Sequence, residues 1–261
     1  MGRNWKEVLA VWTDTRSIVV VAVVAALYAA LRLPFAAFQI IPTFTEIRPG
    51  AVVPPLAGVL FGPPAAWGAA IGNTIGDVFA GMISLGTVGG FVGNFLLAYV
   101  PYRMWSRNLR RHAGGEPLRP AATVPSLMVV GVVGALVCAA AIGWFVDAMG
   151  LLPLLPLALA ILFNNAVVGV VLLPVLYPLI LPRARRLRML ASPPEESAAS
   201  RIRSMLGLYM TVAGAAAVVA TAVCFYRGDP SRVLDFGGSP AGVWARCWMW
   251  YVLMMVGVVL L

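Results

Sequence analysis

Long apolar runs, separated by short Arg-rich loops, constrain the fold of this chain more than any other feature. A helix crosses a bilayer with roughly 20 apolar residues. The 261 residues are 61% hydrophobic and only 11% charged, which is far more apolar than a soluble domain. A shorter apolar piece lies between Pro49 and a Gly-Pro-Pro turn, because proline interrupts helices. We therefore expect an all-α integral membrane protein with apolar segments at 17–33, 50–61, 64–83, 86–102, 124–147, 154–181, 204–226 and 242–261.

The cations predict how the chain is oriented. Of the 19 lysines and arginines, 14 fall in 1–16, 103–123 and 182–203. Cytoplasmic loops are enriched in such residues, so we expect both termini on the cytoplasmic side of the cell membrane. The same clustering accounts for the net charge of +9 without a nucleic-acid partner. A cleaved signal peptide is the competing interpretation of the first run, but the basic leader of 16 residues is long for one.

A few polar side chains interrupt the apolar runs, where each is costly. Asn73 and Asp77 lie four residues apart and so share a helical face, Asn94 lies in the next segment, and Asn164 and Asn165 lie in a later one. At about 1.5 Å per residue, all of them lie about 9 to 16 Å from the outer ends of their helices. This common layer predicts a substrate site. Hydrogen bonding between helices is the alternative for any single asparagine.

The segment 33–49 joins the first two apolar segments and is too irregular for a span. It holds three prolines and three phenylalanines, and it is too apolar for a solvated loop. We expect a lid over the outer mouth that offers polar contacts to a ligand beneath aromatic side chains. An ion pair between Glu46 and Arg48 at the headgroups is the alternative. The candidate ligand contacts in this lid are Gln39, Thr43, Thr45, Glu46 and Arg48.

Small residues repeat every four positions on two segments, which lets helices approach closely. Gly68, Gly72 and Gly76 precede the polar pair on a neighbouring row, and this stripe is expected to pack inside the bundle. The second stripe has two interpretations, an internal packing face or a docking face for another membrane subunit. It consists of Ala22, Ala26 and Ala30.

Groups that catalysis needs are sparse. His112 is the only histidine and lies in an Arg-rich loop, which excludes His-based triads and HExxH zinc sites. No nucleotide-binding glycine motif opens a helix, and Asp77 is the one carboxylate clearly within the membrane. Cys138, Cys224 and Cys247 are scattered and odd in number. We expect no enzymatic activity, no catalytic residue, no metal and no cofactor.

Two stretches resemble a known family. They are FTEIRPGAVVPPLAGVLFGPPAAWGAAIGNTIGD and GTVGGFVGNFLLAYVPYRMW. Together with the alanine stripe they resemble the substrate-binding S components of energy-coupling factor (ECF) vitamin transporters. The similarity covers roughly 17–182, and its most specific part is the LFGP turn followed by a glycine-rich helix.

The resemblance implies a six-helix bundle that captures a vitamin or related micronutrient with high affinity from the outer side. It implies that 39–48 is the lid and that the polar layer is the ligand cavity. It also implies that Ala22, Ala26 and Ala30 dock onto a transmembrane coupling subunit driven by a pair of cytoplasmic ATPases. Toppling of the S component in the bilayer then delivers the ligand inside.

The chain departs from the family pattern after this core. We expect the S-component-like core at 1–182, a basic cytoplasmic linker at 183–203, and two additional transmembrane helices at 204–261. An ATP-independent small-molecule transporter and, less closely, a membrane-embedded transferase are the alternative functions. The outer layer shows no cationic cluster for phosphate and no paired carboxylates, so a largely neutral heterocycle is favoured. Flavins, cobalamins and deazapurines all remain open.

Overall fold

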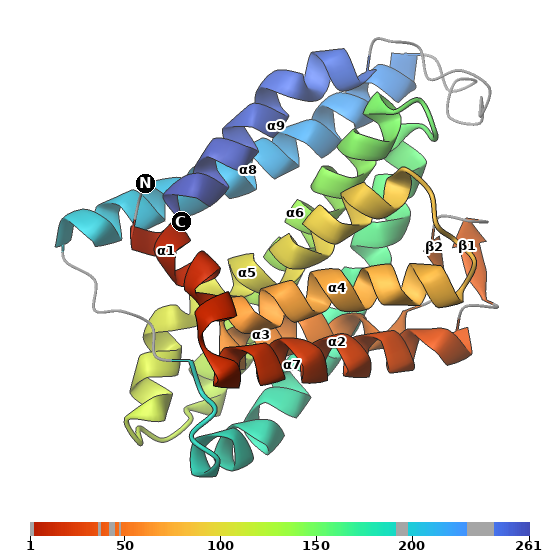
Figure 1. The fold of residues 1–261 in the computed structure, drawn as a ribbon. Helices are drawn as coiled ribbons and strands as arrows, with labels where there is room; N and C mark the ends of the chain where they lie inside the picture. Colours follow the sequence, from red (N-terminus) through yellow and green to blue (C-terminus); the bar gives the residue numbers. More distant parts are fainter. Residues whose placement is uncertain (1–2, 36–37, 42–44, 47, 192–197, 229–242) are drawn as a thin grey trace.

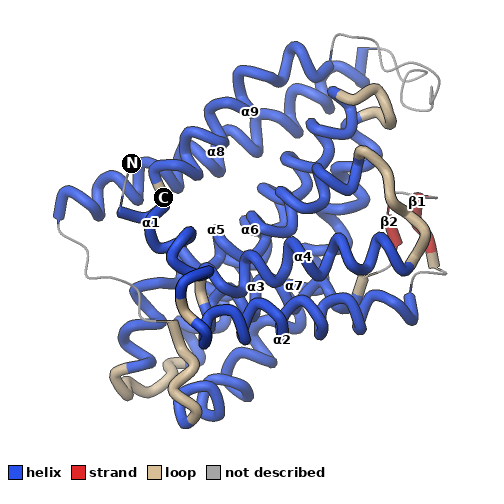
Figure 2. Tube along the Cα trace, in the orientation of Figure 1, coloured by secondary structure: helices blue, strands red, loops and turns tan. Residues whose placement is uncertain are grey.

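A computed structural model describes residues 3–35, 38–41, 45–46, 48–191, 198–228 and 243–261 (Figure 1). Almost all of this chain is helical, and the described strands form one small antiparallel pair (Figure 2). The helices are α1 Arg3–Ala10, α2 Thr15–Arg32, α3 Val53–Phe61, α4 Pro63–Phe79, α5 Gly86–Ala113, α6 Pro120–Ala148, α7 Leu154–Arg186, α8 Ala198–Gly228 and α9 Val243–Leu260. Short 3₁₀ turns cover Val11–Thr13, Leu33–Phe35 and Pro49–Val52, and the strands are β1 Gln39–Ile41 and β2 Thr45–Glu46.

The all-α membrane fold predicted from the apolar runs is confirmed. Within the described chain, four helical stretches are long and apolar enough to cross a membrane: Thr15–Phe35, Pro120–Ala148, Leu154–Arg186 and Arg201–Phe225. Pro49–Phe61 and Cys247–Leu260 are shorter apolar helices. Every apolar segment predicted from sequence coincides with a helix, the short 50–61 piece included. The sequence did not anticipate α1, which is polar and only eight residues long.

Two local signals place the start of α2 and the break after α3. The Asp14 carboxylate caps α2 by accepting from the backbone amides of Arg16 and Ser17, at 3.4 and 3.0 Å. Gly62 has φ of +72°, a left-handed conformation that suits glycine, and Pro63 then opens α4. The chain therefore reverses between α3 and α4 within a single residue.

The glycine stripe packs inside the bundle, as predicted. A Cβ built on Gly68 would lie 2.8 Å from the Val21 carbonyl oxygen, and one on Gly72 would lie 2.7 Å from the Ala25 carbonyl oxygen. Helix α4 therefore lies directly against the backbone of α2. The row of α2 that meets it includes Ala25 and Ala29, both buried.

The side chains on the face of α2 opposite α4 are exposed. Ala22, Ala26 and Ala30 are exposed, and so are the larger side chains Val23 and Leu27 beside them. Because these side chains face away from α4, the alanine stripe forms part of an outer surface of the described bundle.

Helices α8 and α9 form a tight hairpin that packs chiefly on α6 (Figure 1). A Cβ on Gly214 would lie 2.6 Å from the Met254 backbone nitrogen, so these two helices touch through their backbones. Trp144 of α6 stacks on Tyr251 of α9, with ring centroids 3.9 Å apart and planes within 9°. The additional helices are thus attached on a side of the core other than the exposed face of α2.

The two ends of the bundle differ. At one end, β1 and β2 pair beyond the last residues of α2 and α4, with Gln39 opposite Glu46 (Figure 1). We call this the lid end. At the other end, which we call the Arg-rich end, α5 and α7 finish and α6 and α8 begin. Helix α7 continues to Arg186 and α8 starts at Ala198, so both helices extend into 183–203. The division into a core, a linker and additional helices stays a prediction.

Candidate functional site

A buried ion pair near the lid end anchors a polar cluster between α2 and α4. Arg32 Nη2 lies 2.8 Å from Asp77 Oδ1. Arg32 Nη1 donates to the Asn73 carbonyl oxygen at 2.7 Å and to Asn73 Oδ1 at 3.0 Å. Arg32 is 2% exposed and Asp77 is 7% exposed. The opposite charges and the hydrogen bonds offset the cost of taking both groups out of water.

The glycines of α4 and α5 make room for this cluster. A Cβ on Gly76 would lie 2.7 Å from Arg32 Nη1, and one on Gly90 would lie 2.8 Å from Asn73 Nδ2. Asn73 Nδ2 also donates to Asp77 Oδ2 at 3.2 Å, which the spacing of four residues on one helical face permits. The glycines of α4 therefore let α2 pack closely against it and leave room for the guanidinium of Arg32 at the end of α2.

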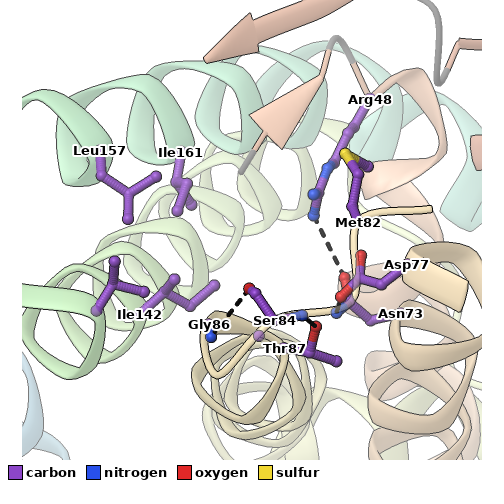
Figure 3. Close-up of a pocket in the computed structure, with 12 residues that line it drawn as sticks. Arg48, Asn73, Asp77, Met82, Ser84, Gly86, Thr87, Ile142, Leu157 and Ile161 are labelled. Carbon is purple, nitrogen blue, oxygen red and sulfur yellow. Dashed lines mark hydrogen bonds between the residues drawn. The ribbon is translucent and has the colours of Figure 1, made fainter. Parts of the chain in front are cut away.

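Arg48 brings a second guanidinium to the cluster from the segment that follows β2. Its Nη1 donates to Asn73 Oδ1 at 3.3 Å (Figure 3). Its backbone amide donates to Asn164 Oδ1 on α7, also at 3.3 Å. The end of the predicted lid segment is thus held against both α4 and α7.

These side chains form the polar end of a small cavity of about 30 Å³, part of which is open to solvent. Asn73, Asp77 and Arg48 face it at one side (Figure 3). Ser84 in the turn before α5 and Thr87 in the first turn of α5 add hydroxyl groups. The Thr87 hydroxyl accepts from the Ser84 backbone amide at 3.2 Å, which fixes this turn. The opposite wall is apolar, with Ile142, Leu157 and Ile161 across the cavity from Asp77 (Figure 3). Val146 also lines the cavity, and Met82 lies on the polar side, beside Arg48.

The other predicted asparagines lie at different places around the helices. Asn94 Oδ1 accepts from the Tyr28 hydroxyl at 2.8 Å, and its Nδ2 donates to the Gly90 carbonyl oxygen at 2.8 Å. Asn165 Nδ2 contacts Cys138 Sγ at 3.7 Å. Neither asparagine is among the residues that line the cavity. Asn164 contacts the site through its hydrogen bond with the Arg48 backbone amide.

Much of the predicted lid lies outside what the structure describes. The backbones of Gln39, Thr45 and Glu46 belong to β1 and β2, but their side chains are outside the described part. Thr43 is outside it altogether. The roles assigned to these four residues stay predictions, as do those of Asn94, Asn164 and Asn165.

Arg32 was not among the site residues predicted from the sequence. An arginine that follows an apolar run is usually a headgroup anchor, so its position gave no sign that it turns inward. The available signal was Gly76, since a glycine next to a buried carboxylate leaves space for a partner. The apolar wall of the cavity was also not predicted. Ile and Leu occur on the lipid-facing and the inward-facing sides of membrane helices alike, so the sequence does not show which of them line a cavity.

The matching family supports a transport role for the bundle. A family model described as QueT transporter matches residues 18–181, from α2 to near the end of α7. The chain belongs to the QueT transporter family. QueT proteins are ECF S components for queuosine precursors, so the resemblance drawn from the sequence is confirmed. Comparison with curated proteins and with solved structures found no match. The hairpin of α8 and α9 lies outside the matched range.

The family and the site describe a membrane-embedded transporter S component that takes a small-molecule substrate. Among the described residues, no group of three or more His, Cys, Asp or Glu side chains is placed to hold a metal ion. The polar cluster instead offers hydrogen-bond donors from Arg48 and acceptors from Asp77 at the edge of an apolar slot. Such an arrangement orients an apolar ligand that carries a few polar groups.

Proposed function

We propose that this protein captures a queuosine precursor at its lid end and passes it to an ECF energising module. The observation that carries the proposal is the cavity in which Asp77, Asn73 and Arg48 meet an apolar wall within the region matched by the family. In the proposed orientation both termini are cytoplasmic and the lid end faces outward in the cell membrane, which follows from the arginines at the opposite end.

The chemistry of the cavity suits a deazapurine base. A guanine-like edge presents adjacent N–H donors next to a carbonyl oxygen. Asp77 supplies a carboxylate to accept from the donors, and Arg48 supplies donors for the carbonyl oxygen. Ile142, Leu157 and Ile161 offer an apolar surface for the face of the ring. Arg32 acts as a positioning residue, because its bond to Oδ1 leaves Oδ2 of Asp77 directed toward Asn73 and the cavity.

Coupling is proposed to use the exposed alanine stripe of α2. Ala22, Ala26 and Ala30 face outward, and the α8–α9 hairpin packs chiefly on α6 instead. The additional helices therefore leave this surface accessible to a transmembrane coupling subunit. The small side chains allow close approach of a partner helix. Two cytoplasmic ATPases bound to that subunit would supply the energy for release inside.

The substrate proposal is tested with the purified full-length protein. Mass spectrometry should find a deazapurine co-purified at one molecule per protein, and calorimetry on ligand-free protein should show tight binding of a 7-deazaguanine base. Riboflavin serves as the control heterocycle. A bound flavin or cobalamin, with no binding of the base, would reject the proposed substrate.

The coupling proposal needs a separate test in cells. Uptake of the base should disappear when the ATPase pair is removed, while binding to the isolated protein persists. Uptake that continues without the ATPases would show an autonomous transporter.

A further inference from the structure

A groove at the Arg-rich end lies between the core and the C-terminal hairpin, away from the substrate cavity. It is formed by the last turns of α5 and the first turns of α8, and its volume is about 250 Å³. Arg103, Arg107 and Arg201 line it, together with the polar side chains of Ser106, Asn108 and Ser204. No acidic side chain is among its described lining residues.

Among the described residues, nearby acidic groups do not cancel the positive charge of the groove. Glu7 Oε2 lies 3.9 Å from Arg103 Nη1, and Glu7 also accepts from the Tyr102 hydroxyl at 2.5 Å. Arg107 and Arg201 are exposed, and no ion pair involves either of them within the described chain. Counting Glu7 and the terminal carboxylate of Leu261 against the three guanidiniums still leaves the groove positive.

The groove has an apolar side as well. Met104, Met205, Leu208 and Leu261 line it beside the arginines. Arg103 follows directly on the apolar stretch that ends at residue 102, and Arg201 precedes the one that begins at 204. The cations therefore lie at the depth of lipid headgroups, and Leu208 lies about 10 Å deeper along α8 than Arg201. A phospholipid has the same arrangement, with its phosphate at headgroup depth and its acyl chains deeper in the bilayer.

We propose that the groove binds one anionic glycerophospholipid, with its phosphate between Arg107 and Arg201 and its acyl chains along Met205 and Leu208. Basic pockets between transmembrane helices are suited to anionic headgroups, and guanidinium groups match phosphate oxygens in geometry. The lipid fills the groove between α5 and the first turns of α8, so it bridges the hairpin to the core at this end.

The test uses native mass spectrometry of the full-length protein with phosphatidylglycerol, phosphatidylcholine and inorganic phosphate as probes. One phosphatidylglycerol should be retained, and phosphatidylcholine much more weakly. The double variant R107Q/R201Q should bind phosphatidylglycerol about 30-fold more weakly, because each cation near an anionic headgroup contributes about fivefold. Substrate binding should not change, since neither arginine lies in the substrate cavity.

Two further variants separate a built site from general surface charge. R186Q/R188Q removes the same charge from exposed positions at the same end and should leave lipid retention within about twofold. Leu208→Trp keeps every cation but fills the apolar part of the groove, and it should lower retention of the lipid without affecting inorganic phosphate. Equal losses in both arginine double variants would overturn the proposal. Saturation by inorganic phosphate with no preference for phosphatidylglycerol would overturn it too, in favour of a soluble anion.

Discussion

The ion pair between Arg32 and Asp77 allows stability and substrate binding to be separated by mutation. Both side chains are almost fully buried, and the guanidinium and carboxylate are 2.8 Å apart. Removing one member of such a pair leaves an uncompensated buried charge, which costs about 3 to 5 kcal/mol. Replacing both members with apolar residues of similar size is often neutral. The two kinds of variant should therefore behave very differently.

We expect Arg32→Met and Asp77→Leu, made singly, to lower the apparent melting temperature in detergent by about 6 to 20 °C. The double variant Arg32→Met/Asp77→Leu should recover most of that loss, because no charge stays buried. It should still bind the base about 10- to 150-fold more weakly, since hydrogen bonds to a charged group contribute about 1.5 to 3 kcal/mol. Thermal unfolding monitored by tryptophan fluorescence and calorimetry on the same samples provide the two measurements.

Tyr28→Phe is the matched control for this experiment. It removes a buried but neutral hydrogen bond to Asn94, outside the cavity lining. The expected cost is about 0.5 to 1.5 kcal/mol of stability with no change in binding. The reasoning fails if the two single variants melt within about 1 °C of the parent, or if the double variant is no more stable than the less stable single variant. Full ligand affinity in the double variant would show that the substrate does not bind at Asp77.

Four further predictions concern other parts of the molecule. Ala26→Trp should abolish ATPase-dependent uptake and leave binding to the purified protein unchanged, whereas Val129→Trp on an exposed face of α6 should affect neither. Gly76→Ala should lower both stability and affinity, because the added methyl group meets Arg32 at 2.7 Å; an unchanged melting temperature would show that the guanidinium can move aside freely. A cysteine at Gly115 should resist a membrane-impermeant reagent in intact cells and react after permeabilisation, and labelling before permeabilisation would reverse the proposed orientation. Burial and nearby Arg185 lower the pKa of His112 below its usual 6.5, so the folded protein favours the neutral ring. The stability of the protein should therefore fall as the pH drops below about 6.5. His112→Phe should flatten this pH dependence in thermal melts from about pH 8 to about pH 5.5.

The sequence located the membrane helices because a bilayer imposes a simple rule on any chain that crosses it. Backbone groups must bond within helices, and side chains along the span must be mostly apolar. The runs from 17–33 to 242–261 met that rule, and each became a helix. Helix α1 is short and charged, so the rule does not apply to it and its helical state depends on contacts. One of these is the hydrogen bond from Trp67 Nε1 to the Val8 carbonyl oxygen, at 3.0 Å.

The depth of the polar residues along their helices was also predictable from the sequence, but the direction in which their side chains point was not. Counting residues placed Asn73, Asp77 and Asn94 in one layer, yet the layer divides into a cavity wall and a separate contact with Tyr28. The rise along a helix fixes depth, whereas the rotation of each helix about its axis is set by packing against its neighbours. Which polar group faces the cavity therefore depends on how α5 rests on α4.

The sequence by itself determined that this chain is an α-helical membrane protein with an S-component-like core, because apolar length and a local motif are properties of consecutive residues. The tertiary structure alone decided that Arg32 turns inward to Asp77, that the alanine stripe stays exposed, and that the hairpin packs on α6. Each of these outcomes depends on residues far apart in the chain. A guanidinium enters the bundle only where another helix supplies both a carboxylate and, at Gly76, the missing side chain that gives it room.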